Sequence, residues 1–253
     1  MGKIEPIIKQ SLIPVYYFFW RSYILIMNRF YKSKIKSHLD IPIIINNRNR
    51  LSFLKDLINA LEVRGYKNIH IIDNNSNYKP LLEYYKECKY NIFRLKENVG
   101  FLALWKTNIY KSFIHDYYVY TDSDVVPINQ CPENFLETFW NKMRSEKSIM
   151  KIGLSLKIDN LPDYFNKKEE VILWENQYYN NETTDGYFIS NIDTTFALYR
   201  PFMSQGASRL KMLRSKAPFQ AAHMPWYNDS NNLNEEEVFY IKNAKTSTHW
   251  TSK

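Results

Sequence analysis

Between residues 41 and 127, short runs rich in apolar residues each end abruptly in polar residues, and this pattern constrains the fold most. The runs are Ile41–Ile45, Asn68–Ile72, Ile92–Leu95 and Tyr117–Thr121. Segments with helical spacing of apolar residues separate them, so strands and helices alternate. Such alternation predicts an α/β fold, with a mostly parallel sheet flanked by helices. The polar residues that follow the strands are then expected along one rim of the sheet.

The expected helices and later strands can be placed approximately. Apolar residues at helical spacing lie between the strands, and beyond residue 130 the alternation weakens. We see no internal repeat or flexible linker. The expected helices are Leu51–Leu61, a segment beginning at Pro80, Phe101–Ile114, Pro132–Lys142 and Glu235–Ala244. The expected later strands are Ile149–Leu154 and Asn191–Tyr199. Residues 157–190 are expected to be irregular.

Positive charge is concentrated near the amino terminus. The formal net charge is +8. Residues 1–38 contain seven lysines and arginines against one glutamate, a net charge of +6, so the rest of the chain carries +2. Nucleic-acid-binding proteins more often spread cations over the folded domain, so no nucleic-acid partner is expected. The chain therefore divides into a basic arm, residues 1–38, and a domain, residues 39–253.

The arm is also aromatic and apolar. Leu12–Trp20 and Tyr23–Met27 are interrupted by Arg21 and Ser22, so the apolar stretch is too short and broken for a membrane-spanning helix of about 20 residues. No small-residue cleavage site follows, which argues against a secretory signal. An aromatic helix followed by lysines favours a segment lying on an anionic membrane surface. The alternative is a helix packed on its own domain or on a partner chain.

Two carboxylates follow the strand at residues 117–121. Asp122 and Asp124 are separated by one residue, Ser123, and would repel each other at the rim of the sheet. Hard oxygen ligands of this kind suit Mg²⁺ or Mn²⁺. The pattern predicts a site where a metal ion meets a diphosphate. An isolated D-x-D pair occurs often by chance, but this one follows three strand–turn units.

The motifs resemble those of family 2-like glycosyltransferases with the GT-A fold. Their order and spacing match this family over roughly residues 40–130, and only in outline beyond. The matching segments are Ile43–Arg48, His70–Ser76, Asn98–Gly100 and Tyr120–Asp124. The resemblance implies a nucleotide-diphosphate sugar as donor, with a UDP-sugar favoured, and Mn²⁺ or Mg²⁺ as cofactor.

The resemblance also implies roles for particular residues. Asp122 and Asp124 would bind the metal, which acts as a Lewis acid on the donor diphosphate. Asp73 could accept hydrogen bonds from a uracil or a ribose, and Arg48 could approach the phosphates. For Asp73, as for Asn98 and Gly100, a purely structural role in a turn or cap is the alternative. The full donor-binding set is Asn46, Asn47, Arg48, Asp73, Asn98, Gly100, Asp122 and Ser123.

The carboxyl-terminal half is less clearly matched. Related enzymes often supply a late histidine as a third metal ligand, which here would be His223. A carboxylate base is needed in inverting members to deprotonate the acceptor hydroxyl. Glu236 and Glu237 are candidates, although acidic residues in a first helical turn also stabilise the helix dipole. Asp193 is the rival candidate for the base.

Three aromatic residues could also contact a sugar. Trp105, Trp226 and Tyr227 are able to stack on sugar faces, although buried aromatic residues in a core are the commoner explanation.

Competing functions use similar patterns. Haloacid-dehalogenase-like phosphatases also end a strand in D-x-D, and Asp122 would then be the nucleophile, but they carry the motif on their first strand. A dinucleotide oxidoreductase is disfavoured because no G-x-G-x-x-G follows a strand. A catalytically degenerate scaffold with the same fold is the non-enzymatic alternative.

The leading hypothesis is a metal-dependent, inverting glycosyltransferase of the hexosyltransferase type. Its acceptor would be a surface glycan or a lipid-linked glycan, reached through the basic arm. Cys88 and Cys131 have no metal-ligand spacing, which favours a reduced protein. The expected location is the cytoplasm, peripheral to the inner face of the plasma membrane. Sequence indicates neither the oligomeric state nor the sugar.

Overall fold

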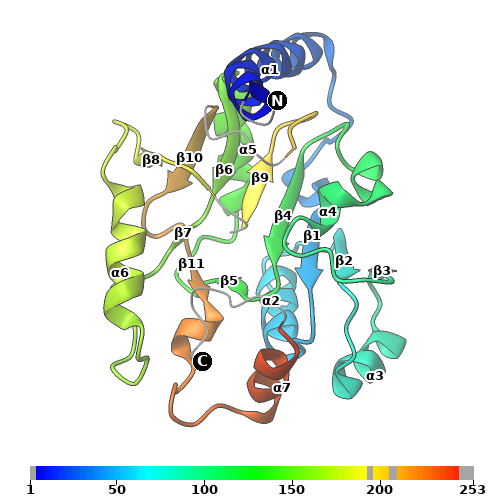
Figure 1. Cartoon of the computed structure of the whole chain (residues 1–253), viewed down its shortest axis with the longest axis vertical. Helices are drawn as coiled ribbons and strands as arrows, with labels where there is room; N and C mark the ends of the chain where they lie inside the picture. The colour runs from blue at the N-terminus through cyan, green and yellow to red at the C-terminus, as the bar shows by residue number, and fades with distance from the viewer. Residues whose placement is uncertain (1–3, 193–195, 205–209, 245–253) are drawn as a thin grey trace.

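The central feature of the fold is an eight-stranded mixed sheet, which runs through the middle of the molecule (Figure 1). The computed structural model describes residues 4–192, 196–204 and 210–244, with side chains from residue 15 onward. The strand order is β3-β2-β1-β4-β9-β6-β10-β8. The strands are β1 (Ile43–Asn47), β2 (Ile69–Asp73), β3 (Asn91–Arg94), β4 (Tyr118–Asp122), β6 (Ile149–Gly153), β8 (Tyr187–Ile189), β9 (Ala197–Tyr199) and β10 (Lys211–Ser215).

The first half of the sheet is parallel. β1 pairs in parallel with both β2 and β4, and β2 pairs with β3. Helix α2 (Ser52–Glu62) connects β1 to β2, and α3 (Lys79–Glu87) connects β2 to β3. Gly65 ends the turn after α2 with φ +83°, a conformation that glycine adopts without strain. The predicted strands and the first two helices are therefore confirmed, with shifts of a few residues at their ends.

The helix predicted over 101–114 is wrong in extent. The structure has a short α4 (Ala103–Lys106) and then a 3₁₀ helix, η2 (Asn108–Ser112). Thr107 separates them with an extended backbone: its hydroxyl donates to the Ala103 carbonyl and accepts from the Ile109 amide. A threonine side chain that bonds to the backbone on both sides competes with a continuous helix.

The second half of the sheet is mixed. β9 runs antiparallel to both β4 and β6, and β8 runs antiparallel to β10. Gly153 allows this close approach, because a side chain there would meet the Phe196 carbonyl oxygen at 3.1 Å. Helix α5 (Phe135–Ser145) precedes β6, and α6 (Lys168–Asn176), followed by η3 (Gln177–Tyr179), precedes β8. The interpretation of 157–190 as irregular missed α6 and β8, and β10 was not anticipated.

A second, three-stranded sheet lies at the carboxyl ends of the central strands. Its order is β5-β11-β7, where β5 is Val125–Pro127, β7 is Ser155–Leu156 and β11 is Gln220–His223. The chain then continues through η4 (Met224–Tyr227) to the last described helix, α7 (Glu235–Asn243). In Figure 1, α7 lies next to α2 at the bottom of the view. The predicted closing helix at 235–244 is confirmed.

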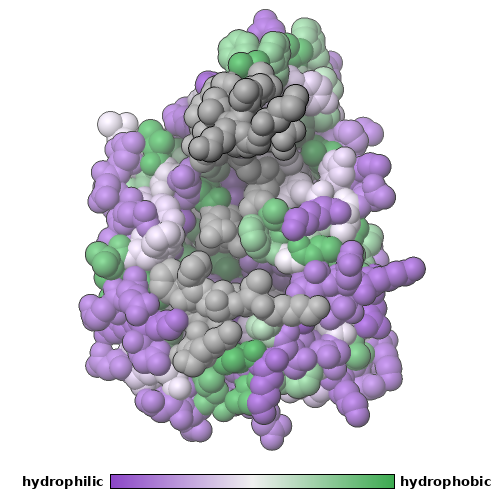
Figure 2. Space-filling model, viewed as in Figure 1, coloured by the Kyte–Doolittle hydropathy of each residue, from purple (hydrophilic) through white to green (hydrophobic). Residues whose placement is uncertain are grey.

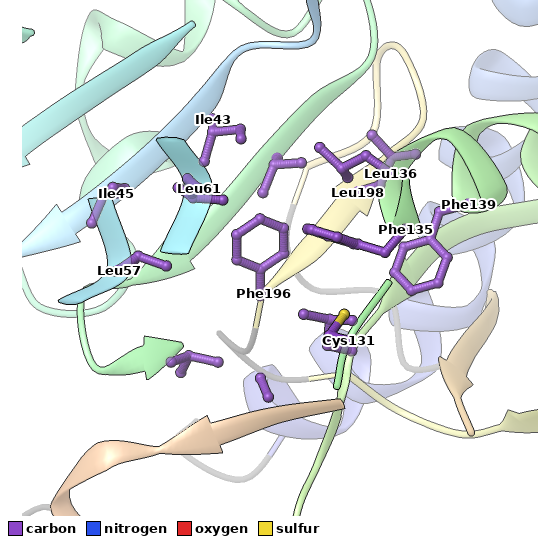
Figure 3. Packing of buried hydrophobic residues seen from close by; sticks show 14 of the residues in the cluster. Ile43, Ile45, Leu57, Leu61, Cys131, Phe135, Leu136, Phe139, Phe196 and Leu198 are labelled. Carbon is purple, nitrogen blue, oxygen red and sulfur yellow. The ribbon is translucent and has the colours of Figure 1, made fainter. Parts of the chain in front are cut away.

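Hydrophobic clusters cover both faces of the central sheet. Alternate residues of a strand point to opposite faces, so Ile43 and Ile45 belong to a cluster with residues of α2 and α5, whereas Ile44 belongs to the cluster with residues of α1 and α4. Figure 3 shows Phe135, Phe139 and Phe196 packed together in the first cluster. The ring centroids of Phe135 and Phe196 are 5.4 Å apart. The predicted α/β fold, a mostly parallel sheet flanked by helices, is confirmed.

The amino-terminal arm forms one helix, α1 (Ile4–Phe30), which crosses the top of the sheet in Figure 1. Ile24 is buried against the domain, and the Asn28 amide donates to the Pro201 carbonyl at 2.9 Å. The chain then continues through η1 (His38–Asp40) into β1. Among the described residues, no helix is both long enough and apolar enough to span a bilayer.

Candidate active site

Polar residues at the carboxyl ends of β1, β2 and β4 lie side by side. In the sheet register, Asn46 pairs with Asp122 and Asn47 pairs with Asp73. The Asn46 amide donates to Asp122 Oδ1 at 2.9 Å, and the backbone amide of Ser123 donates to the Asn46 carbonyl at 3.1 Å. Parallel pairing of three neighbouring strands therefore brings these predicted residues together on one rim.

Both carboxylate oxygens of Asp73 bind other groups of the protein. Its side chain is 0% exposed, Oδ1 accepts from the Ser76 amide at 3.1 Å, and Oδ2 accepts from Arg94 Nε at 3.1 Å. The Arg94 side chain is 57% exposed at the end of β3. Asp73 therefore orients Arg94, and it is Arg94 that faces solvent at this position. No motif in the sequence pointed to Arg94.

The predicted Asn98–Gly100 turn is attached to the end of β2. The Asn74 side chain donates to the Gly100 carbonyl and accepts from the Val99 amide, both at 2.9 Å. Asn98 Oδ1 accepts from the Gly100 amide, and Gly100 has φ +79°. Asn98 and Gly100 thus shape the turn beside the rim.

Asn47 and Arg48 are directed to other parts of the protein. The Asn47 amide donates to the Tyr85 hydroxyl at 2.9 Å. The Arg48 guanidinium donates to the Asn243 carbonyl at the end of α7, also at 2.9 Å. Arg48 therefore links α7 to the rim in this arrangement.

A buried arginine that follows β1 pairs with one carboxylate of the D-x-D motif. Arg50 is 3% exposed and forms an ion pair with Asp124, while its second terminal nitrogen lies 3.1 Å from Glu237 Oε2. The Tyr240 ring packs 3.9 Å from the guanidinium carbon. Burial alone would lower the pKa of Arg50, but Asp124 and Glu237 more than offset it and raise that pKa. Nothing in the sequence distinguished Arg50 from other cations in polar turns.

β11 brings His223 to the D-x-D pair. His223 pairs with Val125 in the second sheet, and the Met224 amide donates to the Asp124 carbonyl at 2.8 Å. His223 Nε2 lies 3.7 Å from Asp124 Oδ2. An imidazole and a carboxylate distant in sequence therefore face each other.

The donor chemistry of this cluster fits a divalent cation. Carboxylates are ligands that suit Mn²⁺ and Mg²⁺, and a cationic group, the Arg50 guanidinium, is paired with Asp124. Across the residues that the structure describes, no three His, Cys, Asp or Glu side chains are grouped closely enough to hold a metal. The predicted ligands Asp122, Asp124 and His223 are therefore not gathered around one metal position in this arrangement, in which Asp124 is paired with Arg50 instead.

The candidate bases differ in their surroundings. Both carboxylate oxygens of Glu236 accept from the Ser52 amide, at 3.0 and 3.1 Å, so Glu236 caps α2. Glu237 is buried beside Arg50, and burial raises its pKa although Arg50 opposes the shift. In the described part of the chain, Glu237 Oε1 accepts no hydrogen bond. Asp193 lies outside the described residues.

The three aromatic candidates pack within the protein. Trp226 is 1% exposed, with its ring centroid 4.6 Å from that of His223. Trp105 packs against Tyr120 and donates to the Tyr118 hydroxyl at 3.1 Å. The Tyr227 hydroxyl donates to the Asn160 side chain at 2.8 Å. Their roles in this arrangement are therefore structural.

Comparisons with known proteins give similarity to solved structures only. No protein-family model and no curated protein matches the chain. The chain has an α/β fold with the strand order described above.

Three solved structures are similar over most of the chain. The mannosyltransferase PcManGT from Pyrobaculum calidifontis, in complex with GDP-Man and Mn²⁺, has 9% identity and a TM-score of 0.48, covering 94% of this chain and 76% of its own. The S. aureus TarS 1–349 structure has 12% identity and a TM-score of 0.42, covering 82% and 66%. GalNAc-T7 with UDP, GalNAc and Mn²⁺ has 13% identity and a TM-score of 0.46, covering 72% and 43%.

Proposed function

We propose that the chain is a glycosyltransferase that moves a sugar from a nucleotide-diphosphate sugar to an acceptor hydroxyl. The observation that supports this most is the pair Asp122 and Asp124 at the end of a buried parallel strand, with His223 3.7 Å from Asp124. Ligands of α/β sheets bind at this edge. A UDP-sugar is the favoured donor, as the sequence resemblance implies.

Asp122, Asp124 and His223 would hold Mn²⁺ or Mg²⁺. Such a cation neutralises the charge that develops on the leaving nucleotide diphosphate. Arg94, oriented by Asp73 and largely exposed, would contact the nucleotide diphosphate part of the donor. The rim around Asn46 and Ser123 would form the floor of the donor site.

Glu237 is our candidate for the base of an inverting transfer. One of its oxygens is bound by Arg50, and the other accepts no hydrogen bond among the described residues. That oxygen is buried in this arrangement, and it would take the proton of an acceptor hydroxyl that reaches it as the hydroxyl attacks the anomeric carbon. Glu236 is less suited, because Ser52 occupies both of its oxygens.

Thermal unfolding with a panel of nucleotide-sugars, with and without Mn²⁺, tests this function. One donor should raise the melting temperature, and turnover of that donor should release the nucleoside diphosphate. Asp124→Ala should lower Mn²⁺-stimulated turnover by about 100-fold or more, since it removes a predicted ligand. The exposed Asp163→Asn is the matched control. Release of inorganic phosphate from phosphate monoesters would favour the phosphatase alternative, and donor binding without turnover would favour a scaffold.

We further propose that α1 rests on an anionic membrane at the inner face of the plasma membrane, where the acceptor is a lipid-linked or surface glycan. An apolar stripe recurs at intervals of three and four residues on its outward face, which places its side chains on one side of the helix. These side chains are 51–78% exposed, and green side chains gather along α1 at the top of Figure 2. The stripe consists of Tyr16, Phe19, Tyr23, Ile26 and Phe30.

Exposed cations flank this stripe and complement an anionic surface. Arg21 and Arg29 lie on α1, and Lys32 and Lys34 follow it. Vesicles containing phosphatidylglycerol should sediment the protein, and neutral vesicles should bind it less. Replacing Phe19, Tyr23 and Ile26 with serine should abolish sedimentation. If the replacement instead changes the oligomeric state in light scattering, with vesicle binding unaltered, the stripe pairs with a second copy.

A further inference from the structure

Arg50 is paired with Asp124, which is one of the proposed metal ligands. Its guanidinium bridges Asp124 and Glu237 and is almost completely shielded from solvent. Tyr240 packs 3.9 Å from the guanidinium carbon on one side, and the Phe53 ring centroid lies 5.1 Å away. Two carboxylates and two rings therefore hold this cation in place.

A divalent ion and a guanidinium that bind the same carboxylate oxygen repel each other. Asp124 Oδ2 is the oxygen that faces both Arg50 and His223. A metal that joins Asp124 to His223 would be placed against the guanidinium, and like charges at such separations repel strongly in a buried site.

The second carboxylate offers Arg50 an alternative partner. Glu237 Oε2 lies 3.1 Å from one terminal nitrogen, whereas Asp124 binds the other. If the guanidinium leaves Asp124, the contact with Glu237 keeps its charge paired inside the protein. Glu237 and Tyr240 both lie on α7, so the last described helix carries the groups that would retain Arg50.

We propose that Arg50 is an internal cation that competes with the divalent metal for Asp124, with Glu237 as the partner that receives it when the metal binds. The inference rests on the proposed function, because it concerns the same metal site. Arg50 is then a positioning residue: it keeps the carboxylates apart and neutralised before the metal arrives, and it sets how tightly the metal binds. Metal affinity without donor is thereby kept low by the chain itself.

Manganese binding without donor, measured by electron paramagnetic resonance of free Mn²⁺, tests the competition. Arg50→Gln should bind Mn²⁺ at least about tenfold more tightly than the wild type, since its competitor is gone. Glu237→Gln should bind it more weakly, because Arg50 then depends on Asp124 alone. General damage to the fold would not be expected to tighten Mn²⁺ binding in one of these two variants and weaken it in the other. Arg144→Gln, on the far helix α5, is the matched control and should bind as the wild type does.

Unchanged or weaker Mn²⁺ binding by Arg50→Gln overturns the proposal, as does tighter binding by Glu237→Gln. If Arg50→Gln fails to fold, the double variant Arg50→Gln/Glu237→Gln removes both charges together and should still bind Mn²⁺ more tightly than the wild type. The nucleotide-sugar panel separates the two proposals. Stabilisation by a donor with no gain in Mn²⁺ affinity rejects the competition alone, whereas no stabilisation by any donor rejects the proposed function.

Discussion

The two halves of the central sheet place their charged residues differently. In β1, β2 and β4 the strand bodies are built mainly of apolar and aromatic residues, and the polar residues that form the site come at the carboxyl ends. In the other half, Lys151 and Arg214 lie within strands and are buried, and Arg200 is buried directly after β9. Buried charges are costly unless they are paired or hydrogen-bonded. The second half therefore depends on specific distant partners, whereas the first depends on hydrophobic pattern.

Those partners are present for each buried cation. Lys151 donates to the Ile192 carbonyl at 2.9 Å. Arg200 donates to the Ile149 carbonyl at 2.6 Å and to further carbonyls at the end of α5. Arg214 pairs with Glu175 at 2.8 Å. The comparison predicts that removing a partner in this half is more harmful than replacing the whole pair.

The largest expected effect is at the Glu175–Arg214 pair. Glu175→Ala leaves Arg214 buried without its counter-charge and should cost about 3–5 kcal/mol of unfolding free energy in urea titrations. Glu175→Leu combined with Arg214→Met should recover most of that loss, because no charge is left unpaired. A loss below about 1 kcal/mol in the single variant would contradict the comparison.

The counterpart in the parallel half is a core leucine. Leu57→Ala on α2, at a side chain that is fully buried against the sheet, should cost about 2–5 kcal/mol through lost burial and the cavity left behind. The exposed Val63→Ala is the control and should change stability little. A Leu57→Ala effect as small as the control would show that this half is not held by its apolar pattern.

A smaller effect is expected where α7 meets α2. Glu236→Ala removes the side chain that caps the first turn of α2 at Ser52 and should cost about 1 kcal/mol. Glu235, its exposed neighbour on α7, gives the control variant Glu235→Ala. Equal effects of the two substitutions in thermal unfolding would rule out the cap.

The smallest effect is a pH dependence at the surface of the second half. Lys211 and Lys142 lower the pKa of Glu146 to about 2. A lowered carboxyl pKa stabilises the folded state above the ordinary value of 4.5, and this contribution is lost as pH falls from about 4.5 towards 2. Glu146→Gln should therefore flatten the decline in melting temperature over that range. Glu170→Gln should leave it unchanged, and an identical decline in both variants would contradict the assignment.

The difference between the two halves of the central sheet explains which parts of the fold could be predicted from sequence. The parallel half mostly follows local rules, since each of its apolar runs is a strand and the helical patterns that became α2 and α3 are helices. β10 was missed because Lys211 and Arg214 make Lys211–Ser215 look polar, and the partners that neutralise Arg214 are far away in sequence. The prediction of a continuous helix at 101–114 was wrong because the Thr107 side chain forms hydrogen bonds with the backbone, and helical periodicity does not reveal such bonds.

The residues of the candidate site also divide into those that sequence could predict and those that it could not. Sequence pattern placed Asn46, Asp73 and Asp122 on one rim, because they follow neighbouring strands. It gave no sign of Arg50 or Arg94, whose importance comes from contacts across the fold. Sequence also left Glu236 and Glu237 as equivalent candidates for the base. In the structure, Glu236 binds Ser52 and Glu237 binds Arg50.

Strand β9 has a consequence for how this chain is made. It is synthesised after β4 and β6 but pairs with both of them. Until Ala197–Tyr199 leaves the ribosome, the nascent chain has two strand edges facing an open gap, and such edges invite pairing with other chains. Truncations that end before residue 197 should therefore aggregate, and folding of the whole sheet should follow the completion of the chain.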